Sequence, residues 1–147
     1  MSTAQQQLAE RAAADMYAAD RASQALGIAI AEIGPGFARL TMTVRDDMTN
    51  GHGICHGGFI FALADSAFAF ACNSHGEPNV AAGVSIDFVA PARAGDRLTA
   101  TARERSLGRR TGLYDMEVAR ADGRVIAFVR GRASRLSQPK GPAGAAE

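Results

Sequence analysis

Apolar and polar residues alternate with a period of two over much of the chain, which is typical of strands that bury one face. The first alternating stretch spans residues 28–33, and beyond the turn Gly34-Pro35-Gly36 the alternation continues over residues 40–44. We therefore predict a hairpin with one buried face. The same period returns four times after residue 80, with short connections that suit antiparallel neighbours. These four sequential antiparallel strands are predicted at residues 84–88, 98–102, 112–118 and 125–129.

Two stretches follow a different pattern and are predicted to be helices. Residues 4–20 are rich in Ala, Gln and Leu and lack Gly and Pro, which favours a helix with a weak apolar side at Leu8, Ala12 and Met16. Residues 57–75 are apolar nearly all round, and a glycine follows where a helix would end. Because other elements must cover such a helix, we predict an α+β fold in which one sheet curves around one central helix. The outer face of the sheet and the exposed flank of that helix still need cover, which favours self-association.

Length and composition favour one soluble domain. A chain of 147 residues can bury roughly two-thirds of its unfolded surface, and 47% apolar with 21% charged residues is an ordinary composition for a globular protein. We place the domain at residues 1–136 and expect residues 137–147, rich in Ala, Gly and Pro, to be disordered. The start lacks a secretory signal pattern, and no run approaches about 18 apolar residues, so a cytoplasmic location without membrane association is expected. Cys55 and Cys72 are expected to be reduced thiols.

The net charge of +1 argues against bulk attraction to nucleic acid or to an anionic membrane. The charge is unevenly distributed, however. Residues 93–140 hold twelve basic against five acidic residues, whereas the rest of the chain holds four basic against ten acidic residues. A basic half is either a set of solvated strand faces or a site for a polyanionic small ligand.

The segment with the clearest chemistry is residues 50–58, Asn-Gly-His-Gly-Ile-Cys-His-Gly-Gly, which leads into the predicted central helix. Gly57 and Gly58 at a helix start expose N–H groups at the positive end of the helix dipole, which can bind an anion or an oxyanion developing on a carbonyl. Asp65 follows among apolar residues, where an ionised carboxylate costs several kcal/mol unless it is paired. Asp65 is therefore either a structural residue paired with a polar neighbour, or a catalytic carboxylate of raised basicity that acts as nucleophile or general base.

The spacing of these groups constrains how they could act together. Eight residues separate Gly57 from Asp65, which is about 12 Å along a helix. A nucleophile must stand within about 3 to 3.5 Å of the carbon whose oxygen is bound. One helix cannot supply both groups to one substrate, so a reaction that uses both requires a site at a dimer interface.

Other arrangements in the same segment are weaker. His52, His56 and Asp65 could bind a metal, but the histidines do not share a helix face and no further cluster supplies a firm third ligand, so no metal is expected. Cys55 beside His56 could act as a thiol nucleophile, although neighbours in sequence rarely pair in the way such chemistry needs. We expect His75 to interact with the last carbonyls of the central helix.

Asn50-Gly51, His56-Gly57-Gly58 and Leu63-Ala64-Asp65 together resemble the motif of hotdog-fold thioesterases of the PaaI type, the phenylacetic acid degradation thioesterases. The resemblance extends over residues 27–135. It implies the hotdog fold, hydrolysis of acyl-CoA thioesters of the aryl- or hydroxyphenylacetyl-CoA type to free acid and CoA, homodimers often paired into homotetramers, and no metal or redox cofactor.

The resemblance also implies roles for single residues. The residue matching Asp65 is the nucleophile or the base that activates water, and the backbone N–H matching Gly57 polarises the thioester carbonyl. Residues matching Asn50 and His56 orient substrate or water, and the residue matching Ser85 assists near the carboxylate. Further substrate contacts are expected from His52, from Gly58 and from arginines of the basic half that would hold the CoA phosphates. The arginines in turn-like segments are Arg93, Arg109 and Arg110.

Two other functions stay open on the sequence. One is a dehydratase that acts on a β-hydroxyacyl thioester with His52 or His56 as base. The other is a non-catalytic oligomer that binds acyl-CoA. The products distinguish these two functions from thioester hydrolysis. A dehydratase gives an enoyl product, a thioesterase gives free CoA, and a binding protein leaves the CoA ester intact.

Overall fold

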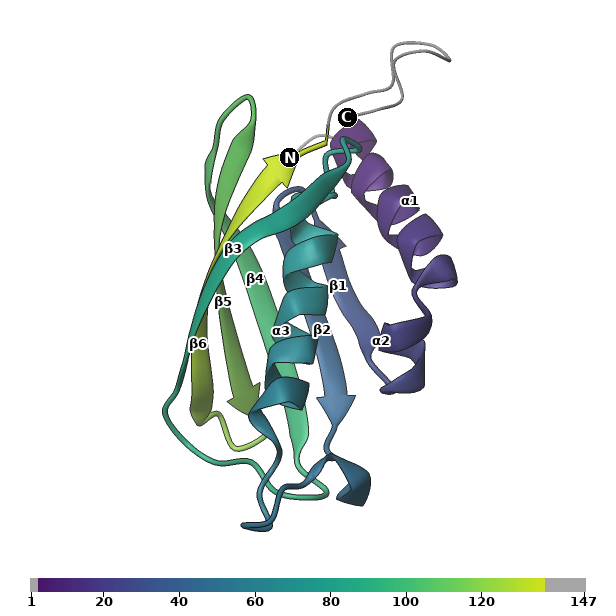
Figure 1. Ribbon diagram of the computed structural model, residues 1–147. Coiled ribbons are helices and arrows are strands. Elements are labelled where there is room, and N and C mark those ends of the chain that lie inside the picture. Colours follow the sequence, from purple (N-terminus) through teal and green to yellow (C-terminus); the bar gives the residue numbers. More distant parts are fainter. Residues whose placement is uncertain (1–2, 137–147) are drawn as a thin grey trace, which may run out of the picture.

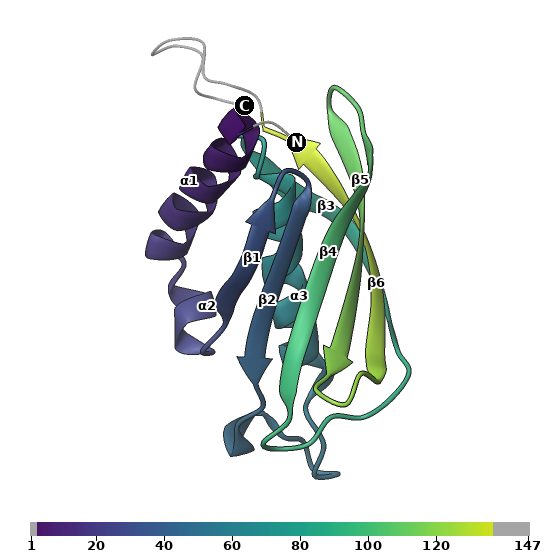
Figure 2. The ribbon, with the colours of Figure 1, turned by 180° about the vertical axis from the view of Figure 1, so that it is seen from behind.

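The computed structural model describes residues 3–136, so the tail predicted at residues 137–147 lies outside the described residues. One curved antiparallel sheet wraps around a long central helix, and an N-terminal helix lies beside the β1 edge (Figure 1, Figure 2), which confirms the predicted hotdog architecture. Within residues 3–136, no helix is both long enough and apolar enough to span a membrane. The helices are α1 (Thr3–Ala19), α2 (Arg21–Ala25), α3 (Gly57–Cys72) and the short 3-10 helix η1 (Asp46–Met48). The strands are β1 (Ala29–Gly34), β2 (Phe37–Thr43), β3 (Asn79–Phe88), β4 (Arg97–Leu107), β5 (Thr111–Arg120) and β6 (Val125–Arg135).

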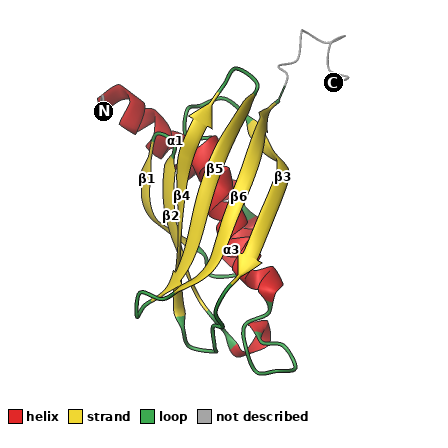
Figure 3. Ribbon diagram, turned by 90° about the vertical axis from the view of Figure 1, so that its left-hand side faces the viewer, coloured by secondary structure: helices red, strands yellow, loops and turns green. Residues whose placement is uncertain are grey.

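The strand order is β1-β2-β4-β5-β6-β3, with every neighbouring pair antiparallel. The prediction of four sequential neighbours is therefore wrong for β3, which pairs with β6 at the far edge of the sheet (Figure 3). The link from β3 to β4 crosses beneath the start of α3 and is fixed at both ends. Val89 N donates to Ile126 O at 2.8 Å, and Gly95 N donates to Val44 O at 2.8 Å. A period of two shows which face a strand buries but not which strand lies beside it.

The concave face of the sheet and one side of α3 form the core. The α3 residues in the core recur every three or four positions, and Phe68 and Phe70 are 1% exposed. Phe68 packs against the Tyr114 ring of β5, at a centroid distance of 5.5 Å. The α3 helix ends at Cys72 rather than at residue 75, because Asn73 caps it and its side chain bonds both Asn79 N and Asn79 O.

The N-terminal helix differs in detail from the prediction. Its fully buried residues are Ala9 and Ala13, whereas the predicted Leu8 and Ala12 are partly buried and the predicted Met16 packs against the core. The short helix α2 was not predicted. Asp20 caps it by accepting a hydrogen bond from Ser23 N at 2.9 Å.

Candidate active site at the start of the central helix

The loop before α3 is folded back on itself by Asn50. The Asn50 Oδ1 atom accepts hydrogen bonds from His52 N at 2.9 Å and from Ile54 N at 3.4 Å. Asn50 N donates to Ile54 O at 2.8 Å, and Gly53 adopts a φ of +76°, which favours glycine. In this chain the carbonyl side of the Asn50 amide therefore shapes the loop, while His52 is exposed at its tip.

The end of the loop is fixed between two other segments, which sets where α3 begins. Cys55 N donates to Ala92 O at 2.7 Å, and His56 N donates to Met48 O at 2.7 Å. These bonds tie the helix start to η1 on one side and to the link between β3 and β4 on the other. The position of the first helical N–H group is therefore set by backbone bonds to two distant parts of the chain.

His56 caps α3, and this leaves one N–H of the first turn available. The His56 Nδ1 atom accepts a hydrogen bond from Gly58 N at 3.3 Å, and Phe59 N donates to His56 O at 3.0 Å. Within residues 3–136, the Gly57 N–H has no hydrogen-bond partner. Of the two glycines predicted to present N–H groups, Gly57 can therefore do so and Gly58 is used by the cap.

A phenyl ring lies directly against Gly57. A Cβ atom added at Gly57 would stand 3.0 Å from Cζ and 3.3 Å from Cε1 of Phe88, the last residue of β3. Phe88 is 50% exposed, so its ring forms an open apolar wall beside the Gly57 N–H. The sequence did not single out Phe88, because its place in the alternation is that of any strand residue.

Asp65 is the half-buried carboxylate of α3. Burial raises the pKa of Asp65 above its ordinary value, and the negative charge of Asp20 raises it further. Within residues 3–136, the Asp65 carboxylate makes no hydrogen bond and no ion pair. The structural interpretation, in which a polar neighbour of this chain pairs with Asp65, therefore finds no such neighbour. The predicted rise in basicity agrees with the direction of the pKa shift.

Asp65 and Gly57 do not meet within one chain. Both lie on α3, eight residues apart, so about 12 Å of helix separates them. Asp65 shares a partly exposed flank of α3 with Phe61, Ala62 and Ala69, each of which is partly buried. Phe61 also lies outside the core cluster. The prediction that one flank of the central helix still needs cover agrees with this partly exposed apolar surface, and Asp65 lies in it.

Several predicted site residues lie elsewhere in this chain. Ser85 is opposite Arg130 in the sheet register, on the outer face that points away from α3, so it does not reach Asp65 of the same chain. Arg93 lies at the same end as the loop, since its neighbour Ala92 bonds Cys55. The other two arginines of the prediction, Arg109 and Arg110, lie in the β4–β5 turn at the opposite end of the sheet (Figure 2).

The cysteine and His75 hypotheses do not fit the structure. Cys55 is 3% exposed, and burial, with a smaller effect of Asp96, raises the pKa of its thiol, so the nucleophilic thiolate is disfavoured. Within residues 3–136, the His75 side chain makes no hydrogen bond to the carbonyls at the end of α3. Its Nε2 atom instead forms a 2.7 Å hydrogen bond with Glu104 Oε1. No group of three or more His, Cys, Asp or Glu side chains suited to a metal occurs among the described residues.

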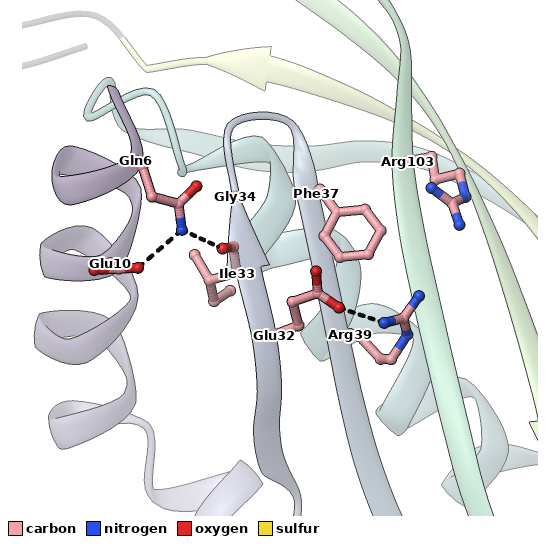
Figure 4. A pocket seen from close by; sticks show the side chains of 8 residues that line it. All are labelled: Gln6, Glu10, Glu32, Ile33, Gly34, Phe37, Arg39 and Arg103. Carbon is pink, nitrogen blue, oxygen red and sulfur yellow. Dashed lines mark hydrogen bonds and ion pairs between the residues drawn. The ribbon is translucent and has the colours of Figure 1, made fainter. Parts of the chain in front are cut away.

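A surface groove of about 600 Å³ lies between α1 and the β1–β2 hairpin. Figure 4 shows Gln6 and Glu10 on one side of this groove and Phe37, Arg39 and Arg103 on the other. None of the predicted site residues lines it. This groove therefore does not mark the predicted site, and the chemistry points to the start and the open flank of α3.

A protein-family model described as the thioesterase superfamily matches residues 52–127, which include the end of the loop, α3 and most of the sheet. The chain belongs to the thioesterase superfamily. This thioesterase is 50% identical over 121 residues to acyl-coenzyme A thioesterase PaaI of Escherichia coli K12, covering 82% of this chain and 86% of that protein. A putative esterase of Archaeoglobus fulgidus is 39% identical over 132 residues, covering 90% and 86% of the two chains.

Solved structures agree with this membership and with the PaaI resemblance. The PaaI protein of the Escherichia coli phenylacetic acid degradation operon matches the thioesterase with a TM-score of 0.89 and 47% identity, covering 90% of this chain and 96% of that one. A Streptococcus mutans protein solved with bound acetyl CoA matches with a TM-score of 0.73 and 25% identity, covering 76% and 90%.

Proposed function

We propose that this thioesterase hydrolyses acyl-CoA thioesters at a site shared by two copies of the chain, with Asp65 of one copy acting beside the Gly57 N–H of the other. The observation that carries the proposal is a half-buried carboxylate without a partner, on the open flank of a helix whose first N–H is also unpaired. The similarity to acyl-coenzyme A thioesterase PaaI and to a protein with bound acetyl CoA supports the substrate class.

The surface that would hold the second copy is the edge formed by β3 and α3. Eight of the ten β3 residues are exposed, and β3 pairs with β6 on one side alone. Val84 and Phe88 are 36% and 50% exposed, although they lie opposite the buried residues Gly131 and Ala127 and so face α3. A long strand edge next to an open apolar flank favours pairing with an identical edge.

Two-fold symmetry then fixes the relative position of the two helices. Helices that pack across a perpendicular two-fold axis run antiparallel, so each residue lies level with one residue of the second copy. Gly57 and Asp65 lie level across the axis only if Phe61, midway between them, lies on it. Phe61 belongs to the same open flank as Asp65, one helical turn before it, which supports this arrangement.

In the proposed reaction the Gly57 N–H of one copy donates to the thioester carbonyl oxygen and stabilises the negative charge that develops there. Asp65 of the other copy either attacks the carbonyl carbon or takes a proton from the attacking water. The C–S bond breaks, and the CoA thiolate leaves and takes up a proton. If Asp65 itself attacks, water then hydrolyses the anhydride formed between the acyl group and Asp65, so on either route thioester and water give acid and thiol. Two roles follow from the resemblance: Asn50 and His56 would orient substrate or water.

We also propose aryl- or hydroxyphenylacetyl-CoA as the substrate, because the PaaI structure comes from a phenylacetic acid degradation operon. Phe88 beside Gly57 and Phe61 on the open flank supply apolar walls for an aromatic acyl group. Among the predicted arginines, Arg93 is favoured for the CoA phosphates, because it lies at the same end of the chain as Gly57.

A first experiment measures thiol release from phenylacetyl-CoA. Asp65→Asn should abolish turnover while the protein stays folded, and retention of near-normal turnover would remove Asp65 from the mechanism. Incubation of the protein with a hydroxyacyl-CoA tests the two other functions, dehydration and non-catalytic binding. Enoyl product would indicate a dehydratase, and an ester that stays bound and intact for hours would indicate a binding protein.

A second experiment tests the shared site by complementation in a Phe88→Ala background. Gly57→Pro deletes the N–H at a helix position where proline is tolerated, and Phe88→Ala removes the ring that a larger residue would strike. Mixing this variant with Asp65→Asn should restore about a quarter of the activity of Phe88→Ala alone, since half of the dimers are mixed and each has one intact site. No recovery, with exchange verified by mass spectrometry, would show that the sites are not shared.

Cross-linking tests the position of the axis independently. With helix axes about 8–10 Å apart, facing Cα atoms come within disulfide reach, so Phe61→Cys should form a covalent dimer on mild oxidation. Ala121→Cys, exposed in the β5–β6 turn, is the matched control and should stay monomeric on a non-reducing gel.

A further inference from the structure

The junction between α1 and α2 packs against α3 beside Asp65 through a chain of hydroxyl groups. Ser23 Oγ donates to Asp20 Oδ2 at 2.6 Å, and Ser23 Oγ lies 2.8 Å from Ser66 Oγ. Ser23 is 2% exposed and Ser66 is partly buried, so the contact is mostly shielded from water. Ser66 follows Asp65 on α3. The chain of hydroxyls therefore links a carboxylate of the N-terminal segment to the turn of α3 that holds the proposed catalytic carboxylate.

The direction of the hydrogen bonds follows from the available protons. An ionised carboxylate only accepts, so the single proton of the Ser23 hydroxyl is used on Asp20. The proton between the two serines must then come from Ser66, which donates to Ser23. The Ser66 hydroxyl is therefore bound to Ser23, so this turn of α3 is linked to Asp20 through two hydrogen bonds.

Asp20 also acts on Asp65 through its charge. The other titratable groups around α3 are uncharged or are bonded to residues other than Asp65. Cys72 of α3 is a neutral thiol whose pKa burial raises to about 12, and Tyr17 of α1 donates its hydroxyl to Ile28 O at 2.6 Å. From the sheet, Tyr114 of β5 donates to Glu104 of β4 at 2.9 Å, and Glu104 is also bonded to His75 just beyond the end of α3. Among the described residues, Asp20 is the charged group that acts on Asp65.

We propose that Asp20 is a positioning residue for the Asp65 reaction, acting through the Ser23 and Ser66 hydroxyls and through its own negative charge. The hydroxyl chain ties the turn of α3 that carries Asp65 to the junction of α1 and α2, and the Asp20 charge disfavours a second negative charge nearby, so the Asp65 carboxyl keeps a high affinity for a proton. The inference rests on the proposed function, since it gives Asp20 a role only if Asp65 reacts. It makes the N-terminal segment part of the catalytic apparatus rather than a cover for the sheet edge.

Two substitutions at Asp20 separate charge from structure. Asp20→Asn keeps a good helix cap, because Asn accepts the Ser23 N–H as Asp does, but it removes the negative charge. Asp20→Glu keeps the charge but is a poorer cap. The pH dependence of kcat/KM for phenylacetyl-CoA, followed by thiol release with dithiodipyridine, reports the ionisation of the catalytic carboxylate in the free enzyme.

The two substitutions should affect different properties, one the pH profile and the other the stability. Asp20→Asn should keep its thermal stability, lower kcat several-fold and move the acid limb of the profile to lower pH, because the Asp65 carboxyl becomes a weaker base. Asp20→Glu should lose stability but leave the acid limb in place. Asp15→Asn, an exposed site on α1 with the same change in charge, should leave both properties unchanged.

An acid limb that does not move in Asp20→Asn, or a shift equal to that of Asp15→Asn, would overturn the role of Asp20. If Asp65→Asn is inactive in the same assay, such a result refutes this inference alone. If Asp65→Asn keeps its turnover, the proposed function fails and the role of Asp20 fails with it.

Discussion

Replacing Gly131 with alanine should destabilise the protein through a single close contact. A Cβ atom added at Gly131 on β6 would lie 2.7, 2.8 and 3.0 Å from three ring atoms of Phe68, which is 1% exposed on α3. Forcing a methyl group into a packed core costs about 1–3 kcal/mol. The loss of unfolded-state entropy on going from Gly to Ala offsets about 0.4–1 kcal/mol. The expected net loss is about 1–2 kcal/mol of unfolding free energy.

Urea denaturation at one fixed protein concentration measures this loss. With a slope of about 2 kcal/mol per molar urea, the midpoint should fall by about 0.5–1 M. Gly51→Ala is the matched control, because its added Cβ would meet nothing within 4 Å and its φ is not positive. That variant should be as stable as the parent protein or slightly more stable.

A second substitution identifies the cause. In a Phe68→Leu background the ring atoms are absent, so Gly131→Ala should cost little, and the two changes should show a coupling of at least about 1 kcal/mol. An equal cost of Gly131→Ala in both backgrounds would refute the explanation by contact with the ring.

Three further predictions concern titration and hydrogen bonding. Because the folded-state pKa of Asp65 lies above 3.8, unfolding free energy is lost as pH rises from 3.8 through the folded pKa. Asp65→Asn should therefore be more stable than the parent protein at pH 7 in urea titrations. The variant should lose that advantage below pH 3.8. Cys55 and Cys72 should react with Ellman's reagent only in denaturant, and rapid labelling of the native protein would contradict their burial. Tyr114→Phe removes a 2.9 Å hydrogen bond to Glu104 and should cost about 1.5–3 kcal/mol by urea denaturation; an unchanged midpoint would contradict this.

The predictions that succeeded rest on patterns with one physical meaning. A segment as apolar as residues 57–72 must be a buried helix in a chain of this size, and the alternation over residues 40–44 requires one buried face. Helix α2 could not be found in this way, because five residues without an apolar pattern form a helix only when capped and packed. The position of β3 could not be found either, because it depends on a link that crosses the molecule.

In the candidate site, too, some residues could be predicted from the sequence pattern and others depend on tertiary packing. Asp65 and Gly57 are visible in the sequence because a charge among apolar residues and a glycine pair at a helix start both need an explanation. Phe88 and Asp20 are not visible, because a strand phenylalanine and an acidic cap are common. Phe88 lies against Gly57, and Asp20 accepts a hydrogen bond from Ser23. Only the fold shows these two contacts, because no sequence pattern marks them.

The two edges of the sheet differ, and in the proposed dimer this difference would limit further growth by strand pairing. The outer edge of β1 is six residues long, is interrupted by a bulge between Ile30 and Glu32, and has Gln6 bonded to the Ile33 carbonyl. Growth into a filament requires two edges that can each accept a neighbour. In the proposed dimer, in which two copies join through β3, the outermost strands of the pair would both be β1, so growth by further strand pairing would stop there.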